Sequence, residues 1–228
     1  MASSVVEVDA QPLSKHCVQP WERREHACLG ISPFNSYFST ARITALVEWA
    51  QARFARVHLF VPDQAAAYTL EALGYSPERA AHKAHRQARY LRNKIERALE
   101  SAGAPAGHDL VLDTQAVEGN ERYRALREQA RTWFETDPVI RRACLDASHW
   151  VLASRTRTTA PTEDQLHAAA RYFLAELPFF LDTPGIVGTD SSVFCYHQPP
   201  EFLRTLYERK LPCPVHPGQG FATVMTTP

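Results

Sequence analysis

Residues 26–61 carry the pattern that most constrains the fold of this chain. The run 26–31 (HACLGI) is almost entirely apolar and ends at a Ser-Pro break, which predicts a buried strand. Apolar residues then recur at helical spacing over 41–55, and 56–61 (RVHLFV) predicts a second strand. A strand, a helix and a strand over this length are typical of a βαβ unit with a parallel sheet. Ligands of such sheets bind beyond the carboxyl ends of the strands, so the segment after the first strand is a candidate site.

The rest of the chain alternates helices with strands. Ser76 and Pro77 are typical of a helix start, and this helix is expected to run to about residue 101. Thr162 and Gln165 form a capping-box pattern that opens a helix through about Leu181. Strands are also expected at 109–117, 191–197 and 221–226, and helices at 120–135, 138–153 and 200–210. The predicted fold class is α/β, with a Rossmann-like, mostly parallel sheet flanked by helices.

Length and composition favour a single large domain. The 228 residues are predicted to form a flexible N-terminal tail over 1–22 and one Rossmann-like domain over 23–228. Lys+Arg and Asp+Glu are equal at 25 each, so the net charge indicates no partner. The five cysteines are scattered without a C-x-x-C pair, which favours reduced thiols. No apolar run approaches the ~20 residues that span a bilayer, and the first residues lack a signal peptide, so a cytoplasmic protein without a membrane partner is expected.

One helix has an unusually basic surface. Over 82–99 an apolar stripe lies on one face, and Glu96 is the only acid among the remaining positions. Surface helices normally mix charges of both signs, so these cations are expected to repel one another unless a polyanion neutralises them. The pattern favours binding to a phosphate backbone, and a merely solvated face is the alternative. The basic positions are Lys83, Arg86, Arg89, Arg92, Lys94 and Arg97.

Ser32 follows the first buried strand in the stretch Gly-Ile-Ser-Pro-Phe-Asn-Ser. A serine at this junction can be exposed beside backbone N–H groups, which suits a nucleophile whose oxyanion needs hydrogen-bond donors. The alternative is a serine that only caps the loop. Phe34 stands where the hydrolase elbow G-x-S-x-G has its second glycine, so a Ser-His-Asp hydrolase is disfavoured.

Three segments in order resemble motifs of the cyclodipeptide synthase family. They are the nucleophile segment GISPFNSYFS, the helix segment YFLAELPFF from Tyr172 to Phe180, and the closing strand SSVFCYH that ends at His197. The resemblance spans about residues 25–225, and the basic helix lies between the first two segments. Asn35, Tyr196 and His197 also match the subfamily named for these three residue types. The family's fold resembles the catalytic domain of class I tyrosyl- and tryptophanyl-tRNA synthetases.

The resemblance implies a reaction between two aminoacyl-tRNAs, bound through the basic helix, by an enzyme that acts as a monomer. Ser32 would attack the first aminoacyl ester, and Tyr172 and Glu176 would hold the α-ammonium group of the bound amino acid. Tyr196 would relay protons during cyclisation, with Asn35 and His197 as supports. Without the family motif, Tyr172 and Glu176, one helical turn apart, would be interpreted as a surface pair. The HIGH and KMSKS signatures of ATP binding are absent, and no cofactor or metal is expected.

Two amino-acid pockets follow from positions in the family pattern. The first pocket would be lined by Cys28, Gly30, Phe179 and Phe194. The two phenylalanines would fill volume and favour a small first amino acid, although an aromatic substrate stacked on them is an alternative. The second pocket would lie near Ser154 and Arg155, where the arginine favours a polar or acidic residue or, alternatively, contacts tRNA.

Two other functions remain open at the level of the sequence. A non-catalytic tRNA-binding protein would keep the fold and the basic helix, but the intact set of Ser32, Tyr172, Glu176 and Tyr196 disfavours it. An aminoacyl-tRNA-dependent transferase would pass the aminoacyl group to another acceptor, and only the identity of the product separates it from a cyclising enzyme.

Overall fold

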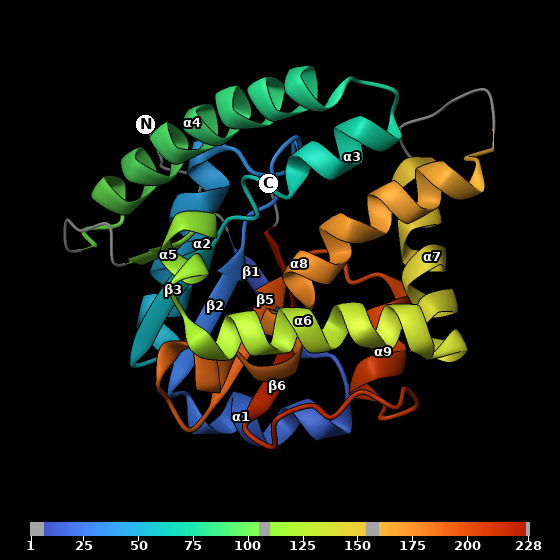
Figure 1. Ribbon diagram of the computed structural model, residues 1–228. Helices are drawn as coiled ribbons and strands as arrows, with labels where there is room; N and C mark the ends of the chain where they lie inside the picture. Colours follow the sequence, from blue (N-terminus) through green and yellow to red (C-terminus); the bar gives the residue numbers. More distant parts are fainter. Residues whose placement is uncertain (1–6, 105–109, 154–159, 227–228) are drawn as a thin grey trace.

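The computed structural model describes residues 7–104, 110–153 and 160–226, and its centre is a six-stranded sheet (Figure 1). The strand order is β1-β6-β5-β2-β3-β4, and all neighbours are parallel except β1 and β6. The strands are β1 (Val8–Pro12), β2 (His26–Gly30), β3 (Arg56–Phe60), β4 (Val111–Leu112), β5 (Ser192–Tyr196) and β6 (Gln219–Thr226). This arrangement confirms the predicted α/β class with a mostly parallel, Rossmann-like sheet.

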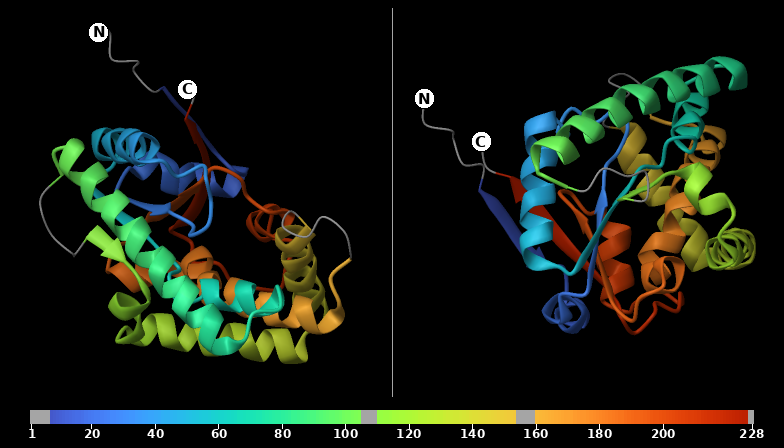
Figure 2. Two further views of the ribbon diagram at one scale, coloured as in Figure 1. Left: turned by 90° about the horizontal axis from the view of Figure 1, so that it is seen from above. Right: turned by 90° about the vertical axis from the view of Figure 1, so that its left-hand side faces the viewer.

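Helices cover both faces of the sheet, as the right-hand view of Figure 2 shows. One face packs against α2 and α4 through a core that includes Ile43, Leu46, Leu91 and Ile95. The other face packs against α6, α7, α8 and α9. The helices are α1 (Val18–Arg23), α2 (Thr40–Arg53), α3 (Ala66–Ala72), α4 (Pro77–Ser101), α5 (Thr114–Glu118), α6 (Glu121–Thr136), α7 (Pro138–Ala153), α8 (Glu163–Val187) and α9 (Glu201–Tyr207).

The N-terminal segment is ordered from residue 8, so the prediction of a flexible tail over 1–22 is wrong for most of its length. Strand β1 pairs antiparallel with β6, with Val8 opposite Thr226. The η1 turn (Lys15–Cys17) and α1 follow it. The segment lacks an apolar run because β1 alternates half-buried and exposed residues at the edge of the sheet. Its stability comes from pairing with a strand more than two hundred residues away, which no local pattern reveals.

The predicted strand over 109–117 is also wrong beyond its first residues. Strand β4 contains only Val111 and Leu112, and the short helix α5 follows. Asp113 ends the strand because its side chain accepts a hydrogen bond from the Ala116 N–H and caps that helix.

Helix α8 extends past the predicted end near residue 181, but it bends at Asp182. The Asp182 backbone leaves the helical region (φ −159°, ψ 60°), and its buried carboxylate accepts hydrogen bonds from Arg122 Nε (2.7 Å) and the Gly185 N–H (2.8 Å). The predicted capping box at the other end is confirmed: the Gln165 N–H donates to Thr162 Oγ1 (3.3 Å), and the Thr162 N–H donates to Gln165 Oε1 (2.9 Å). Among the described residues, none of the helices has the length and apolar character needed to cross a membrane.

Candidate active site

The site lies where the direction of the strand order reverses. From β2 the chain moves outward through β3 and β4, and it then returns to place β5 on the other side of β2. Open parallel sheets bind ligands in the crevice beyond the carboxyl ends of the strands at such a point. Ser32 directly follows β2, and Tyr196 is the last residue of β5. The topology therefore brings together two residues that are 164 positions apart.

The Ser32 hydroxyl is shared between two phenols. Ser32 Oγ lies 2.9 Å from the Tyr196 hydroxyl, and it is also hydrogen-bonded to Tyr172, which comes from α8. The Asn35 amide donates to the Tyr196 hydroxyl (3.4 Å). Among the residues that the structure describes, no histidine is hydrogen-bonded to Ser32, in contrast to a Ser-His-Asp triad. The hydroxyl is instead held by groups that can both donate and accept a proton.

Glu176 lies one helical turn beyond Tyr172, and the two side chains are hydrogen-bonded. Burial raises the pKa of the Glu176 carboxyl to about 8, and the bond to Tyr172 only partly offsets this effect. Burial also raises the pKa of Tyr172 well above its usual value, and the nearby Glu176 adds to the shift. The Glu176 carboxyl is thus largely neutral at pH 7, and a cation beside it would favour the carboxylate.

A cavity of about 550 Å³ opens in front of these groups. Ser32, Asn35, Tyr172, Glu176 and Tyr196 all line it. The remaining walls are mostly apolar, and Trp150 of α7, which is 47% exposed, also contributes to the lining. The other apolar lining residues include Gly30, Phe34, Ala147, Ala169, Phe173, Phe180, Phe194, Pro200, Leu203 and Phe221, and Ser36, Thr69, Ser148 and Gln198 add polar groups.

Gly30 permits the close packing of two aromatic rings beside the serine. A Cβ at this position would lie 2.8 Å from Phe194 Cε1 and 3.2 Å from Tyr196 Cδ2. Any larger residue would therefore push both rings away from β2. The absence of a side chain at Gly30, two residues before Ser32, thus makes room for the Tyr196 ring as well as for the cavity.

Comparison with known proteins decides the family. Residues 8–226 match the family model described as cyclodipeptide synthase. The chain belongs to the cyclodipeptide synthase family. Members of this family form peptide bonds from aminoacyl-tRNA and yield cyclic dipeptides.

Individual relatives of the family agree with this assignment. The chain is 34% identical to the cyclo(L-leucyl-L-leucyl) synthase of Bacillus subtilis over 221 residues, 94% of this chain and 88% of the relative. It is also 34% identical to the cyclo(L-tyrosyl-L-tyrosyl) synthase of Mycobacterium tuberculosis, over 94% of this chain and 74% of the relative. A solved structure from M. tuberculosis, described as a cyclodipeptide synthetase related to type I tRNA synthetases, superposes with a TM-score of 0.85. It is 33% identical and covers 96% of this chain and 94% of the other.

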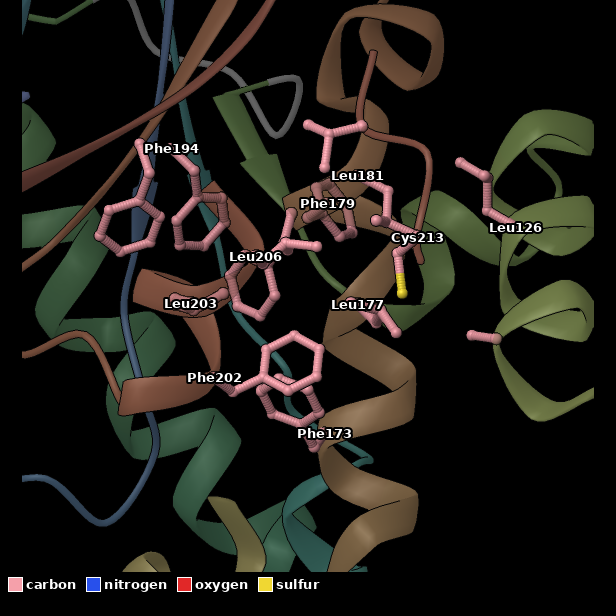
Figure 3. Close-up of a cluster of buried hydrophobic side chains, with 14 of the residues drawn as sticks. Leu126, Phe173, Leu177, Phe179, Leu181, Phe194, Phe202, Leu203, Leu206 and Cys213 are labelled. Carbon is pink, nitrogen blue, oxygen red and sulfur yellow. The ribbon is translucent and has the colours of Figure 1, made fainter. Parts of the chain in front are cut away.

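Two of the four predicted residues of the first pocket lie behind the cavity rather than in its wall. Gly30 and Phe194 line the cavity, whereas Cys28 and Phe179 are fully buried and do not reach it. The Phe179 ring packs on Phe60, with ring centroids 4.0 Å apart. Figure 3 shows Phe179 and Phe194 within the same buried cluster. Ser154 and Arg155, predicted for the second pocket, lie outside the described residues.

His197 lies beside Tyr196 but does not line the cavity. It directly follows β5, and its ring centroid lies 4.5 Å from that of Tyr196, whose side chain reaches the cavity. The His197 ring stacks on Tyr37 with centroids 4.0 Å apart and planes 4° apart. Burial, with a smaller contribution from Arg42, lowers the pKa of His197 to about 4. The lowered pKa favours a neutral imidazole, packed on Tyr37 and Tyr196.

The cations of helix α4 differ in whether they have a partner within the protein, which its sequence does not predict. Arg92 forms an ion pair with Asp113, so the expectation that these cations lack acidic partners is wrong there. Lys94 donates to the Phe38 carbonyl (3.2 Å), and Lys83 donates to the Tyr75 hydroxyl (3.0 Å). Arg86, Arg89 and Arg97 are exposed, and none of them forms an ion pair within the described ranges.

Proposed function

We propose that this cyclodipeptide synthase works by a ping-pong mechanism with two acyl-serine intermediates. The observation that carries the proposal is the Ser32 hydroxyl, held by Tyr196 and Tyr172 at the edge of a cavity. Ser32 Oγ attacks the carbonyl carbon of the ester that links the first amino acid to its tRNA. The bond to the terminal ribose breaks, the tRNA leaves with a proton on its ribose hydroxyl, and an aminoacyl ester of Ser32 remains.

Tyr172 and Glu176 are placed to hold the α-ammonium group of this intermediate. The amine loses a proton to Glu176 and attacks the ester of the second aminoacyl-tRNA, which releases the second tRNA and leaves a dipeptidyl-Ser32. The free amine of the dipeptide then attacks the Ser32 ester carbonyl and closes the six-membered ring. Tyr196 returns a proton to Ser32 Oγ as this bond breaks, and the 2.9 Å contact supports that role.

The partners proposed for this enzyme are two aminoacyl-tRNAs. A cyclodipeptide synthase from Candidatus Glomeribacter gigasporarum that shares the fold (TM-score 0.52, 13% identical) is bound to Phe-tRNAPhe. The exposed arginines of α4 support binding of the same class of molecule here.

We also propose that the enzyme acts as a monomer in the cytoplasm, where charged tRNA is available. The contact between Asn35 and Tyr196, and the packing of His197 beside them, support the Asn/Tyr/His subfamily.

The identity of the product tests the proposed function. The Phe194 ring lies against Gly30, and Phe179 and Phe60 fill the space behind it, which favours a small first amino acid. The proposal that the second amino acid is polar or acidic depends only on the sequence around Arg155. Mass spectrometry of medium from expressing cells is expected to detect serine-dependent cyclic dipeptides that contain at least one small residue. A product with two large aliphatic residues would contradict the substrate preference, and an aminoacylated acceptor in place of a cyclic dipeptide would indicate a transferase.

The pH dependence of acylation is expected to report on Glu176. Its raised pKa means that the carboxylate needed to hold the ammonium is present above about pH 8 and is lost about tenfold per unit below it. The substrate amine loses its own proton above about 8, so kcat/KM should form a bell with its maximum near pH 8. Single-turnover acylation measured from about pH 6 to pH 9.5 tests this profile. Glu176→Gln should remove the acidic limb, and an unchanged acidic limb in that variant would assign it to another group.

A further inference from the structure

Tyr37 occupies the centre of a network that joins the nucleophile loop to the rest of the sheet. Its backbone N–H donates to Asn35 Oδ1 (3.0 Å), and its carbonyl accepts from Arg42 Nη1 (3.2 Å). Asn35 in turn donates through its amide to the Tyr196 hydroxyl. Tyr37 is therefore linked through Asn35 to Tyr196, whose hydroxyl contacts Ser32.

The Tyr37 hydroxyl anchors this loop to the end of β6. It accepts a hydrogen bond from the Thr226 N–H (2.9 Å) and lies 3.1 Å from Thr226 Oγ1. Thr226 is buried and is the last residue of its strand. A phenol that bonds both the backbone and the side chain of one residue fixes the distance between the two segments.

The Tyr37 ring makes the second anchor. It stacks in parallel on His197, which directly follows Tyr196, and the Arg42 guanidinium lies over the ring at 4.7 Å. The Phe38 ring meets Tyr37 edge-on at 5.2 Å. His197 also packs on Tyr196, with ring centroids 4.5 Å apart, so the stack joins the Tyr37 ring to the residue that holds Ser32.

The nucleophile loop needs such anchors because its own backbone is irregular. Residues 31–39 contain no helix or strand, and Phe34 has a positive φ of 59° that an L-residue adopts at a cost. We propose that Tyr37 is a positioning residue that holds Ser32 against Tyr196 by tying this loop to Thr226 and to His197. It does not touch the substrate.

This inference rests on the proposed function, because its first readout is the formation of acyl-Ser32. Tyr37→Phe keeps the stack on His197 and removes both hydroxyl contacts, whereas Tyr37→Leu also removes the stack. We expect Tyr37→Phe to lower the maximal single-turnover rate of acylation about tenfold, and Tyr37→Leu to lower it further, since small misplacements of a nucleophile are costly. The concentration of aminoacyl-tRNA that gives half the maximal rate should not change.

A matched tyrosine and a double-mutant cycle separate positioning from general stability. Tyr207→Phe also removes a buried hydroxyl, which donates to the Phe180 carbonyl (2.7 Å), and it should lower the melting temperature without changing the acylation rate. The effects of Tyr37→Phe and Thr226→Val on the rate should be non-additive, because the two side chains act through one contact. Acylation by Tyr37→Phe at the wild-type rate, or a rate loss equal to that of Tyr207→Phe at the same stability, would overturn the inference.

A second readout keeps this test independent of the tRNA reaction. Covalent labelling of Ser32 by a small sulfonyl fluoride, followed by peptide mass spectrometry, measures whether the hydroxyl is held in a reactive position. Labelling should slow in Tyr37→Phe and remain at the wild-type rate in Tyr207→Phe. Absence of acyl-Ser32 in the wild-type enzyme would remove the proposed function, while the labelling rates would still decide the role of Tyr37.

Discussion

Replacing Ser32 with alanine is expected to abolish both the cyclic dipeptide and the covalent intermediate. The Ser32 hydroxyl is the only nucleophile that the enzyme itself supplies in the proposed mechanism, and its two phenol partners act there as hydrogen-bonding groups. Loss of a covalent nucleophile typically lowers turnover by about 10⁴-fold or more, which is below detection in a product assay. Intact-protein mass spectrometry after mixing with aminoacyl-tRNA measures the intermediate, and analysis of the medium measures the product.

The alanine variant should retain the fold and the binding of tRNA. Ser32 contributes one hydroxyl at the surface of a cavity, so its removal creates no large void in the core. Ser101→Ala is a suitable control, because the partner of this exposed hydroxyl within the described part of the chain is a carbonyl of its own helix, that of Arg97 (2.8 Å). Persistent turnover in Ser32→Ala would eliminate the acyl-serine mechanism. An adduct on Ser32 of the wild-type enzyme that is only hydrolysed would indicate an esterase in place of a synthase.

The polar residues that line the cavity could be picked out from the sequence because their motifs are local. Ser32 with Asn35, and Tyr172 with Glu176, each lie within one short segment, and the βαβ pattern places the serine at the carboxyl end of a strand. Contacts between distant segments could not be predicted in this way. No local pattern pairs β1 with β6, or Arg92 with Asp113.

The role of His197 shows the same limit within the site itself. Its place in a motif predicted a support for catalysis, but the sequence could not show that its ring packs on both Tyr37 and Tyr196, outside the cavity lining. Tyr37 was overlooked because a tyrosine in a loop has no distinctive spacing. The only available signal was its position two residues after Asn35, where an Asn side chain commonly bonds the backbone two residues on.

Reversing the charge of three arginines on α4 is expected to remove tRNA-dependent activity. Arg86, Arg89 and Arg97 are exposed and have no acidic partner among the described residues, so their charge is available to phosphate. Arg92 is a poor choice, because Arg92→Glu would place a second carboxylate against Asp113, which caps α5. The triple change to glutamate should weaken binding of aminoacyl-tRNA by about 10³-fold or more at low salt.

The salt dependence of binding and a charge-matched control variant separate the effect of the α4 surface from that of net charge. Each lost phosphate contact should reduce the slope of log K against log salt by about 0.7 to 0.9, so the triple variant should bind with a visibly shallower slope. The control Arg23→Glu/Arg124→Glu/Arg204→Glu changes net charge equally, but on α1, α6 and α9, away from α4 (Figure 1), and these exposed arginines form no ion pair among the described residues. Acylation of Ser32 by a small activated aminoacyl ester should be unaffected in both variants, since neither alters the cavity. Equal losses of tRNA binding in the two variants would show that net charge, rather than the surface of α4, attracts the tRNA.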